Sequence, residues 1–496
     1  MLPYPALHAS HGGTWIADDA GTREIGRGEA IRIAADTPVV LLNAGLVGQR
    51  LGYAELSGLD LLELFAFLFP ARFAVPTPKG IAQALELPVP AGDADVAAAL
   101  RTAAARMLEI AGGDWPEREG AWHAAQSLFR LRWTWGPAVN AAISKPPTAE
   151  RWLFSKLPEW EETPPRAAPR TVTLGEDAVT GRLDALTGHG AERRQGQRAF
   201  AAAAAAAFDP RSVRDAPNLV LAEAGTGIGK TLGYLAPASL WAAQAGGPVW
   251  VSTYTKALQR QLGNEGTRLF ADPAERRRRI VTRKGRENYA CLLNLEDALQ
   301  GGFAGRAAIL AQLVARWAAF TADGDMVGGD LPGWLPTLFR RNGSTALTDR
   351  RGECIYAGCP HYRKCFIERA ARASADADLV IANHALVMVN AARGRESATR
   401  PTRYVFDEGH HLFDAADAMF SAALTGAESI ELRRWVLGPE ANARGRRRGL
   451  AARLSDVASY DEGGAEAIAA AVNAAAALPS DGWLGRIAEG APFGPL

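Results

Sequence analysis

The chain has 496 residues and a net charge of +1, with 48% hydrophobic and 22% charged residues. This length exceeds one ordinary hydrophobic core, so the sequence predicts two to four domains with the composition of a soluble globular protein. The charge near zero excludes a whole-molecule field that attracts nucleic acid, so any such surface has to be local.

The sequence has neither the pattern of an export signal nor that of a membrane span. Residues 1–5 lack the basic and apolar regions of a signal peptide. The most apolar stretch, 59–75, contains charged residues and prolines and is too short to cross a bilayer. We therefore expect a cytoplasmic protein with reduced thiols and no membrane partner.

The first 157 residues predict a small α/β domain. An apolar strand is expected over 38–42, and helices are expected over 59–69 and 94–111. A stretch rich in proline and glutamate follows, which predicts a linker over 158–180.

From residue 181 onward, apolar strands alternate with helices. The expected strands and helices are, in chain order, strand 218–222, helix 231–244, strand 248–252, helix 255–270, strand 379–382 and strand 403–406. This alternation is typical of a parallel sheet with helices on both faces. The predicted fold class is therefore α/β, with a sheet domain over 181–284 and 371–415 and an insertion over 285–370 that holds every cysteine.

A glycine-rich loop joins the expected strand 218–222 to the following helix. Glycines let the backbone adopt positive φ and bring its amides close to phosphate, and the helix N-terminus adds further N–H donors. Lys230 is expected to bind the β- and γ-phosphates of ATP, and the Thr231 hydroxyl to bind Mg²⁺. Ala224 stands where the strict pattern has glycine. The loop residues expected to bind the nucleotide are Gly225, Thr226, Gly227, Gly229, Lys230 and Thr231.

An acidic box, Asp407-Glu408-Gly409-His410, follows the expected strand 403–406. In phosphate-loop ATPases an acidic residue at a neighbouring strand end holds Mg²⁺, and Asp407 suits that role. Glu408 is expected to orient and polarise the attacking water, and His410 to couple the nucleotide site to a nucleic-acid side. An ordinary solvated Asp-Glu turn is the alternative, which the pairing with the glycine loop disfavours.

Four cysteines lie within one segment of the chain: Cys291, Cys354, Cys359 and Cys365. Structural zinc sites usually combine two close Cys-x2-4-Cys pairs, whereas here one cysteine is remote and the other three are more widely spaced. Four thiolates of this kind suit an iron–sulfur cluster. The spacing favours iron–sulfur and leaves zinc, or four unrelated core cysteines, open.

Several motifs resemble those of the XPD/DinG family of iron–sulfur DNA helicases. Residues 284–291, Lys-Gly-Arg-Glu-Asn-Tyr-Ala-Cys, resemble the segment around the family's first cluster cysteine. Residues 252–262 resemble its DNA-backbone motif, and residues 377–386 resemble the strand and Asn-His turn after the cluster. Arg194-x-x-Gln197 resembles the motif that contacts adenine. The resemblance covers about residues 185–425.

This resemblance implies a RecA-like superfamily-two motor domain with ATP and Mg²⁺ as ligands, Mg²⁺ being held by Thr231 and Asp407. It implies a 4Fe-4S cluster in the insertion, on the four cysteines named above. It also implies a monomer that translocates 5′ to 3′ on single-stranded DNA and unwinds duplex junctions in repair or replication. The residues that it would bring near the DNA are Lys284 and Arg286, with Tyr289 or Tyr356 stacking on a base or packing internally.

The family's second motor domain carries a Gln-x-x-Gly-Arg-x-x-Arg segment, which is absent after Asp407. Residues 416–496 resemble the start of the family's helical arch. We therefore expect the N-terminal part of a longer protein that binds ATP, cluster and DNA but unwinds poorly alone, because it lacks the arginine finger. Two alternatives stay open: a phosphate-loop ATPase with a zinc-bound insertion that remodels nucleic acid without unwinding, and a non-enzymatic DNA-binding fragment.

The N-terminal domain faintly resembles a degenerate ribonuclease-H-like exonuclease fold, which some family members carry at this end. The early Asp-x-Glu metal pair is missing, and two-metal chemistry needs several converging carboxylates. We expect an inactive accessory domain in which Asp18, Asp19 and Asp60 are structural or face solvent.

Overall fold

The computed structural model of the chain divides into two compact units. Unit 1 contains residues 1–159, 286–364 and 425–496, and unit 2 contains residues 160–285 and 365–424. The residues that the structure describes are 3–148, 154–188, 194–225, 227–340, 344–349, 354–393, 401–422, 425–438, 449–455, 461–480 and 482–488.

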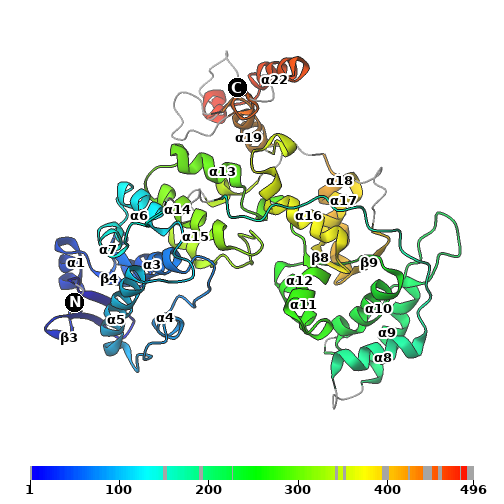
Figure 1. Cartoon of the computed structure of the whole chain (residues 1–496), viewed down its shortest axis with the longest axis horizontal. Helices are drawn as coiled ribbons and strands as arrows, with labels where there is room; N and C mark the ends of the chain where they lie inside the picture. The colour runs from blue at the N-terminus through cyan, green and yellow to red at the C-terminus, as the bar shows by residue number, and fades with distance from the viewer. Residues whose placement is uncertain are drawn as a thin grey trace. The chain divides into compact units, whose positions relative to one another are not determined.

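Unit 1 begins with a mixed five-stranded sheet (Figure 1). Its strands are β1 (Ala6–Ala9), β2 (Thr14–Asp18), β3 (Gly21–Glu24), β4 (Val40–Leu41) and β5 (Leu59–Asp60), in the order β3-β2-β1-β4-β5. The first three strands are antiparallel, whereas β4 lies parallel to both β1 and β5. The predicted strand over 38–42 is confirmed as β4, but β1 to β3 were not predicted from the sequence.

Asp60 ends β5 and begins α3 (Leu61–Leu68), a helix that is buried along its whole length. Its two carboxylate oxygens accept hydrogen bonds from the backbone amides of Asn43, Ala44 and Leu62. Burial, reinforced by the charge of the nearby Glu63, raises the pKa of Asp60 to about 7 against the effect of these amides. The expectation that Asp60 is structural is confirmed, because its oxygens hold the start of α3 and the loop after β4.

The remaining helices of unit 1 come from three separate parts of the chain. Helix α14 (Gly305–Phe320) packs against α3 and α6 (Ala121–Arg130), so part of the predicted insertion shares a unit with the N-terminal residues. The other helices are α1 (Arg27–Asp36), α2 (Ala44–Leu51), α4 (Pro78–Ala84), α5 (Asp93–Gly112), α7 (Gly136–Ala142), α13 (Leu292–Asp297), α15 (Trp334–Leu338), α19 (Gly426–Leu437), α20 (Leu450–Arg453), α22 (Glu462–Ala475) and α23 (Trp483–Ala488).

Unit 2 contains a four-stranded parallel sheet. Its strands are β6 (Val249–Thr253), β7 (Ile280–Thr282), β8 (Leu379–Asn383) and β9 (Arg403–Phe406), in the order β7-β8-β6-β9. Alternate side chains of a strand enter different cores: Val249 and Val251 of β6 join one cluster, and Trp250 joins another. Because both faces of the sheet are covered, the predicted α/β class with a buried parallel sheet is confirmed.

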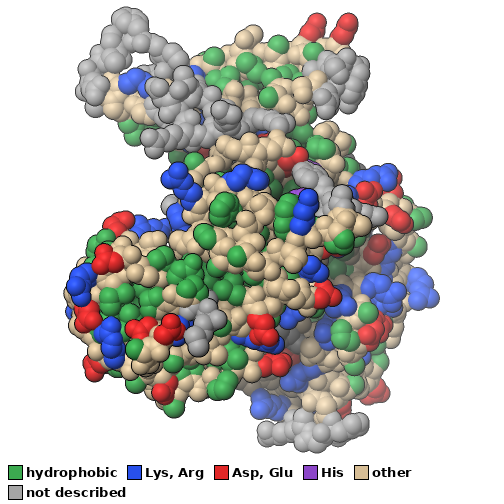
Figure 2. Space-filling view, turned by 60° about the vertical axis from the view of Figure 1, so that its left-hand side comes forward, with side chains coloured by type: hydrophobic (Ala, Val, Ile, Leu, Met, Phe, Trp, Pro, Cys, Tyr) green, Lys and Arg blue, Asp and Glu red, His purple; other side chains and the backbone are tan. Residues whose placement is uncertain are grey.

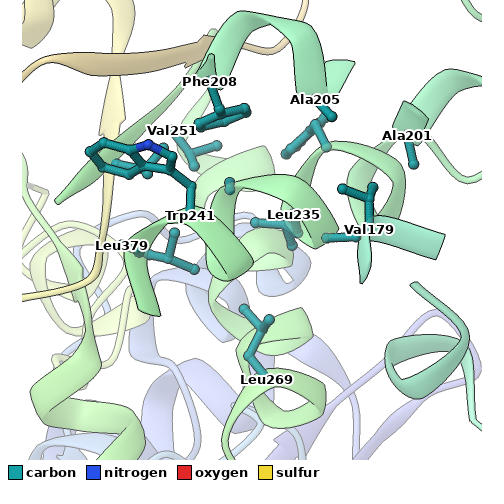
Figure 3. Packing of buried hydrophobic residues seen from close by; sticks show 14 of the residues in the cluster. Val179, Ala201, Ala205, Phe208, Leu235, Trp241, Val251, Leu269 and Leu379 are labelled. Atoms are coloured by element: carbon teal, nitrogen blue, oxygen red, sulfur yellow. The ribbon is translucent and has the colours of Figure 1, made fainter. Parts of the chain in front are cut away.

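The helices of unit 2 pack around this sheet. Figure 3 shows Trp241 and Leu235 of the helix after the glycine loop packed with Val251 of β6 and Leu379 of β8. The predicted helices over 231–244 and 255–270 are confirmed, each to within one residue at both ends. The helices of this unit are α8 (Glu176–Thr187), α9 (Gln195–Ala205), α10 (Lys230–Ala245), α11 (Lys256–Leu269), α12 (Pro273–Arg279), α16 (Phe366–Asp376), α17 (His384–Arg393) and α18 (Leu412–Phe420).

The predicted strand over 218–222 is wrong, because these residues form no strand in the structure. The side chain of Asn218 donates a hydrogen bond to the carbonyl of Asp209, which draws the segment back toward the end of α9 and away from the sheet. Leu219 and Leu221 are 76% and 90% exposed. An apolar run becomes a strand only where a neighbouring strand satisfies its backbone groups, and none pairs with this segment in the part of the chain that the structure describes.

The segment between residue 160 and α8 is extended. It is attached to the sheet domain by a cation–π contact and an ion pair. Trp160 is buried under the guanidinium of Arg372, which lies 3.3 Å from its ring centroid. Arg166 forms an ion pair with Asp378 at 2.8 Å. These contacts attach the proline-rich segment to α16 and to the start of β8.

None of the helices described here is both long enough and apolar enough to span a bilayer. On the face shown in Figure 2, basic and acidic side chains are interspersed rather than gathered into one continuous patch. This mixture agrees with the net charge of +1.

Candidate nucleotide-binding site

The glycine loop has the backbone geometry that a phosphate cradle needs. Gly227 and Gly229 have φ values of 84° and 87°, in the left-handed region that glycine adopts without strain. Lys230 begins α10, whose first N–H groups face the loop. Gly225 and Thr231 flank this turn, and Thr226 lies outside the described residues.

Two side chains from the start of α9 hold the carbonyl oxygens of the loop. Arg194 donates to the carbonyl of Gly227 at 2.7 Å, and Gln197 donates to the carbonyl of Gly229 at 2.8 Å. A Cβ atom at Gly229 would come within 2.3 Å of the Gln197 amide nitrogen, and the φ of 87° would strain the backbone of any residue with a side chain at this position. The structure thus brings the predicted Arg-x-x-Gln pair to the nucleotide loop, and its contact with adenine stays a prediction.

The glycine loop and the acidic box meet through an ion pair. The Lys230 ammonium lies 3.1 Å from the Glu408 carboxylate, although the two residues are 178 positions apart in the chain. The hydrogen bond from Lys230, together with its charge, lowers the pKa of Glu408. Glu408 has a φ of 55°, which is unusual for a residue with a side chain and marks a constrained turn after β9.

Asp407 is more buried than Glu408, and its pKa is shifted in the opposite direction. Burial raises the pKa of Asp407, and the charge of Glu408 adds to this increase, while Lys230 and the Tyr234 hydroxyl oppose it. The Tyr234 hydroxyl is buried beside the side chains of Asp407 and Thr231. The two residues expected to bind Mg²⁺ are therefore brought to one place, next to a phenol that sequence reasoning did not single out.

Three strand ends are joined behind the acidic box. The carbonyl of Ser252, on β6, accepts from the backbone amide of Asp407, and its hydroxyl lies 2.7 Å from Nδ1 of His384, the first residue after β8. Ser252 and His384 are both buried, and burial lowers the pKa of His384. Both residues fall in segments that resemble family motifs, but nothing in the pattern assigned either a role.

The histidines of the box connect it to the segment after β6. Nδ1 of His410 lies 3.6 Å from the Glu408 carboxylate, and its ring contacts that of His411. The His411 ring stacks on Tyr254 with centroids 3.7 Å apart and planes 14° apart. Tyr254 is 49% exposed, so this chain of contacts runs from Glu408 to the surface of unit 2.

The predicted cluster ligands are all partly buried. The sulfur of Cys354 accepts a hydrogen bond from the backbone amide of Tyr356 at 3.3 Å. Cys291 precedes α13 and Cys365 precedes α16, whereas Cys359 follows a short turn. Four thiols fit an iron–sulfur cluster by chemistry, but across the described residues no three histidine, cysteine, aspartate or glutamate side chains are grouped closely enough to hold a metal ion.

The residues predicted to lie near DNA differ in their surroundings. Arg286 is paired with Asp349 and lies 5.1 Å above the ring of Tyr356, which is 53% exposed. Tyr289 and Lys284 are buried. Tyr289 therefore has a packing role in this structure, whereas Tyr356 keeps an accessible ring edge.

These features define the class of protein. A parallel sheet, a glycine loop before a helix and an acidic box at a neighbouring strand end form a mixed α/β nucleotide-binding domain compatible with the RecA-like type.

Comparison with known proteins identifies similar chains. The chain is 36% identical over 265 residues to the ATP-dependent helicase DinG of Mycobacterium tuberculosis (strain ATCC 25177 / H37Ra), a match that covers 49% of this chain and 38% of that protein. It is 32% identical over 254 residues to the ATP-dependent DNA helicase YoaA of Escherichia coli (strain K12), covering 49% and 37%. It is 31% identical over 231 residues to the 3′-5′ exonuclease DinG of Bacillus subtilis (strain 168), covering 46% and 23%.

These matches confirm the resemblance to DinG-type helicases. No family model matches the chain. The chain spans less than two fifths of the length of these curated relatives.

Proposed function

We propose that the chain carries the nucleotide site of an ATP-dependent DNA helicase. The observation that carries this proposal is the 3.1 Å contact between Lys230 and Glu408. It brings the cation for the phosphates and the carboxylate for the attacking water to one point behind a glycine loop. The names of two relatives, ATP-dependent helicase DinG and ATP-dependent DNA helicase YoaA, support the same activity.

In the proposed mechanism each side chain has a separate task. The loop amides and Lys230 bind the phosphates, and Glu408 orients and polarises the attacking water. Mg²⁺ would be held by Thr231 and Asp407, and it neutralises charge on the phosphate oxygens in phosphate-loop ATPases. The residues present fit this ion, because a hydroxyl and a carboxylate are oxygen ligands of the kind Mg²⁺ takes, and the buried Tyr234 hydroxyl lies beside both.

We further propose that single-stranded DNA, including strands at duplex junctions, binds near the exposed end of the histidine contacts. Tyr254 and His411 offer stacked rings next to the acidic box. Aromatic rings bind bases without sequence preference, and lysine or arginine contacts to the backbone weaken with salt. ATP-driven 5′ to 3′ movement and duplex unwinding in repair or replication complete the proposal.

The first test of this proposal uses Glu408→Gln, which keeps the size of the side chain but removes its charge. We expect wild-type hydrolysis of ATP to rise in the presence of single-stranded DNA. In the variant, hydrolysis should fall about 100-fold or more, because a positioned general base contributes about 10²–10⁴ in rate. Nucleotide affinity, measured with a fluorescent ATP analogue, should stay within a few-fold of wild type.

Each other outcome contradicts a defined part of the proposal. Unchanged hydrolysis in Glu408→Gln would remove Glu408 from the mechanism. A wild-type protein that binds single-stranded DNA but neither binds nor hydrolyses ATP would instead be a non-enzymatic DNA-binding protein. ATP hydrolysis without any effect of DNA would argue against a helicase motor.

A 4Fe-4S cluster on Cys291, Cys354, Cys359 and Cys365 is a second part of the proposal, supported by the donor chemistry and by the amide that donates to Cys354. Protein purified without oxygen should be brown, with broad visible absorbance and about four iron atoms per chain. Cys354→Ser should lose most of this absorbance. Colourless protein with stoichiometric zinc would overturn the cluster in favour of a zinc-bound insertion.

We propose an accessory role without nuclease activity for the N-terminal sheet. Asp60 uses both carboxylate oxygens for backbone amides, Asp18 accepts from the amide of Ala20, and Asp19 pairs with Arg101. Asp60 is therefore engaged in holding the fold, whereas Asp18 caps a local turn and Asp19 faces solvent in a surface ion pair.

A further inference from the structure

Ser252 lies one residue before the end of β6, where three parallel strands end side by side. It is in register with Ala382 of β8 on one side and with Phe406 of β9 on the other. Its backbone carbonyl accepts a hydrogen bond from the amide of Asp407 at 2.8 Å. The first residue of the acidic box is therefore tied directly to the backbone of β6.

The side chain of Ser252 is bonded to a histidine from a second strand end. Its hydroxyl lies 2.7 Å from Nδ1 of His384, the residue that follows β8 and begins α17. Ser252 and His384 are 0% and 2% exposed, so water does not compete for this hydrogen bond. Loss of the bond would deprive two buried polar groups of this partner, which favours a single arrangement of the pair.

The ring of His384 also contacts the third strand end. It lies beside the ring of Phe406, with centroids 6.0 Å apart, and Phe406 immediately precedes the acidic box. His384 is thus joined to β6 by a hydrogen bond and to β9 by an aromatic contact. Because both contacts come from one rigid ring, they hold the start of the acidic box at a fixed offset from the end of β6.

Tyr254, the first residue after β6, carries the exposed ring that is proposed to stack on a base. It stacks on His411, so β6 and the acidic box are attached at a buried point and at an exposed point. If the buried point at Ser252 is fixed, a change at Tyr254 moves His411 relative to Asp407 and reorients Glu408 between them. If the buried point is loose, the whole turn moves together and Glu408 keeps its orientation.

We propose that Ser252 and His384 are positioning residues that couple DNA bound at Tyr254 to the orientation of Glu408. This inference deepens the proposed function and rests on it. Ser252 begins the segment that resembles the DNA-backbone motif of the helicase family, but its hydroxyl is turned into the protein toward His384. Its effect on hydrolysis therefore passes through the acidic box and not through a contact with DNA.

The test is Ser252→Ala, which removes the hydroxyl and keeps the strand. Phosphate release is measured without DNA and with saturating single-stranded DNA, and the ratio of the two rates is the stimulation. We expect the rate without DNA to stay within about threefold of wild type and the stimulation to fall about tenfold, a loss that substitutions within a coupling network produce. Affinity for single-stranded DNA without nucleotide should be unchanged.

Two further variants separate coupling from packing. Ser252→Thr keeps a hydroxyl and should retain most of the stimulation. His384→Phe keeps a ring beside Phe406 but loses the hydrogen bond, and it should lose as much stimulation as Ser252→Ala. The double variant should lose no more than either single variant, because two residues that act through one contact are not additive.

The matched control is Ser239→Ala on α10, which removes another buried hydroxyl of unit 2, one that donates to the carbonyl of Ala236 and accepts from Arg182. Both alanine variants should lower the melting temperature by similar amounts, since each loses a buried hydrogen bond, but Ser239→Ala should keep the stimulation. Unchanged stimulation in Ser252→Ala overturns the inference, and so does an equal loss of both rates. If DNA does not stimulate the wild type, the proposed function fails first and this inference fails with it.

Discussion

Replacement of Lys230 by alanine is expected to lower ATP affinity about 100-fold and to bring ATP hydrolysis to background. A charge-assisted hydrogen bond contributes about 1.5–3 kcal/mol, and this ammonium is placed to serve both the β- and γ-phosphates. Its present partner is Glu408, at 3.1 Å. Without Lys230, the carboxylates of Asp407 and Glu408 would face the phosphates without the positive charge that now pairs with Glu408.

The measurement is the dissociation constant of a fluorescent ATP analogue, together with the rate of phosphate release. Lys79→Ala is the control, because Lys79 is exposed on α4 in unit 1, and it should leave both values unchanged. The Lys230→Arg variant should bind the ATP analogue weakly, since a planar guanidinium does not replace a compact ammonium in a tight loop. An ATP affinity that survives Lys230→Ala would place the nucleotide elsewhere.

Replacement of Arg316 by leucine is expected to destabilise unit 1 by about 3–5 kcal/mol, because each buried carbonyl left without a donor costs about 1–3 kcal/mol. Arg316 lies on α14 and is completely buried. It donates to the backbone carbonyls of Phe67, Glu117 and Glu119, and its guanidinium lies 4.8 Å from the centroid of the Phe67 ring. Leucine fills part of the space but leaves three carbonyl oxygens without their donor.

Urea unfolding followed by tryptophan fluorescence reports this change, because Trp133 and Trp135 are buried in unit 1. The control is Arg106→Ala, which removes a surface ion pair with Glu109 on α5 and should change stability by less than about 0.5 kcal/mol. Arg316→Lys should lie between the two, since an ammonium reaches fewer carbonyls than a guanidinium. An unshifted midpoint in Arg316→Leu would show that the carbonyls are satisfied in another way.

The nucleotide site was largely predictable because its chemistry is local. The three glycines, Lys230 and Thr231 lie within seven consecutive positions, and the helix that begins there was predicted to within one residue at each end. The parallel sheet was also predictable, since β6, β8 and β9 are short apolar runs with helices between them. Such patterns depend on the spacing of apolar residues and on turn residues, and both act over a few positions of the chain.

Other elements depended on partners that the sequence does not reveal. The apolar run 218–222 has the pattern of a strand but has no neighbouring strand, whereas β1 to β3 are weak patterns that pair with one another. Tyr234, Ser252 and His384 were not assigned roles, because their importance lies in neighbours from distant segments. A lone buried tyrosine on a helix looks the same whether its hydroxyl faces a core or a ligand site.

By itself, the sequence determined the α/β class, the glycine loop that begins α10 and the residue types of the acidic box, because all three arise from local backbone preferences and side-chain chemistry. Three contacts were decided by the tertiary structure alone. Lys230 pairs with Glu408, which is 178 positions away in the chain, Gln197 donates to the carbonyl of Gly229, and Arg316 donates to the carbonyl of Phe67. The physical reason is that these contacts exist only where strand order and helix packing bring remote segments within hydrogen-bond distance.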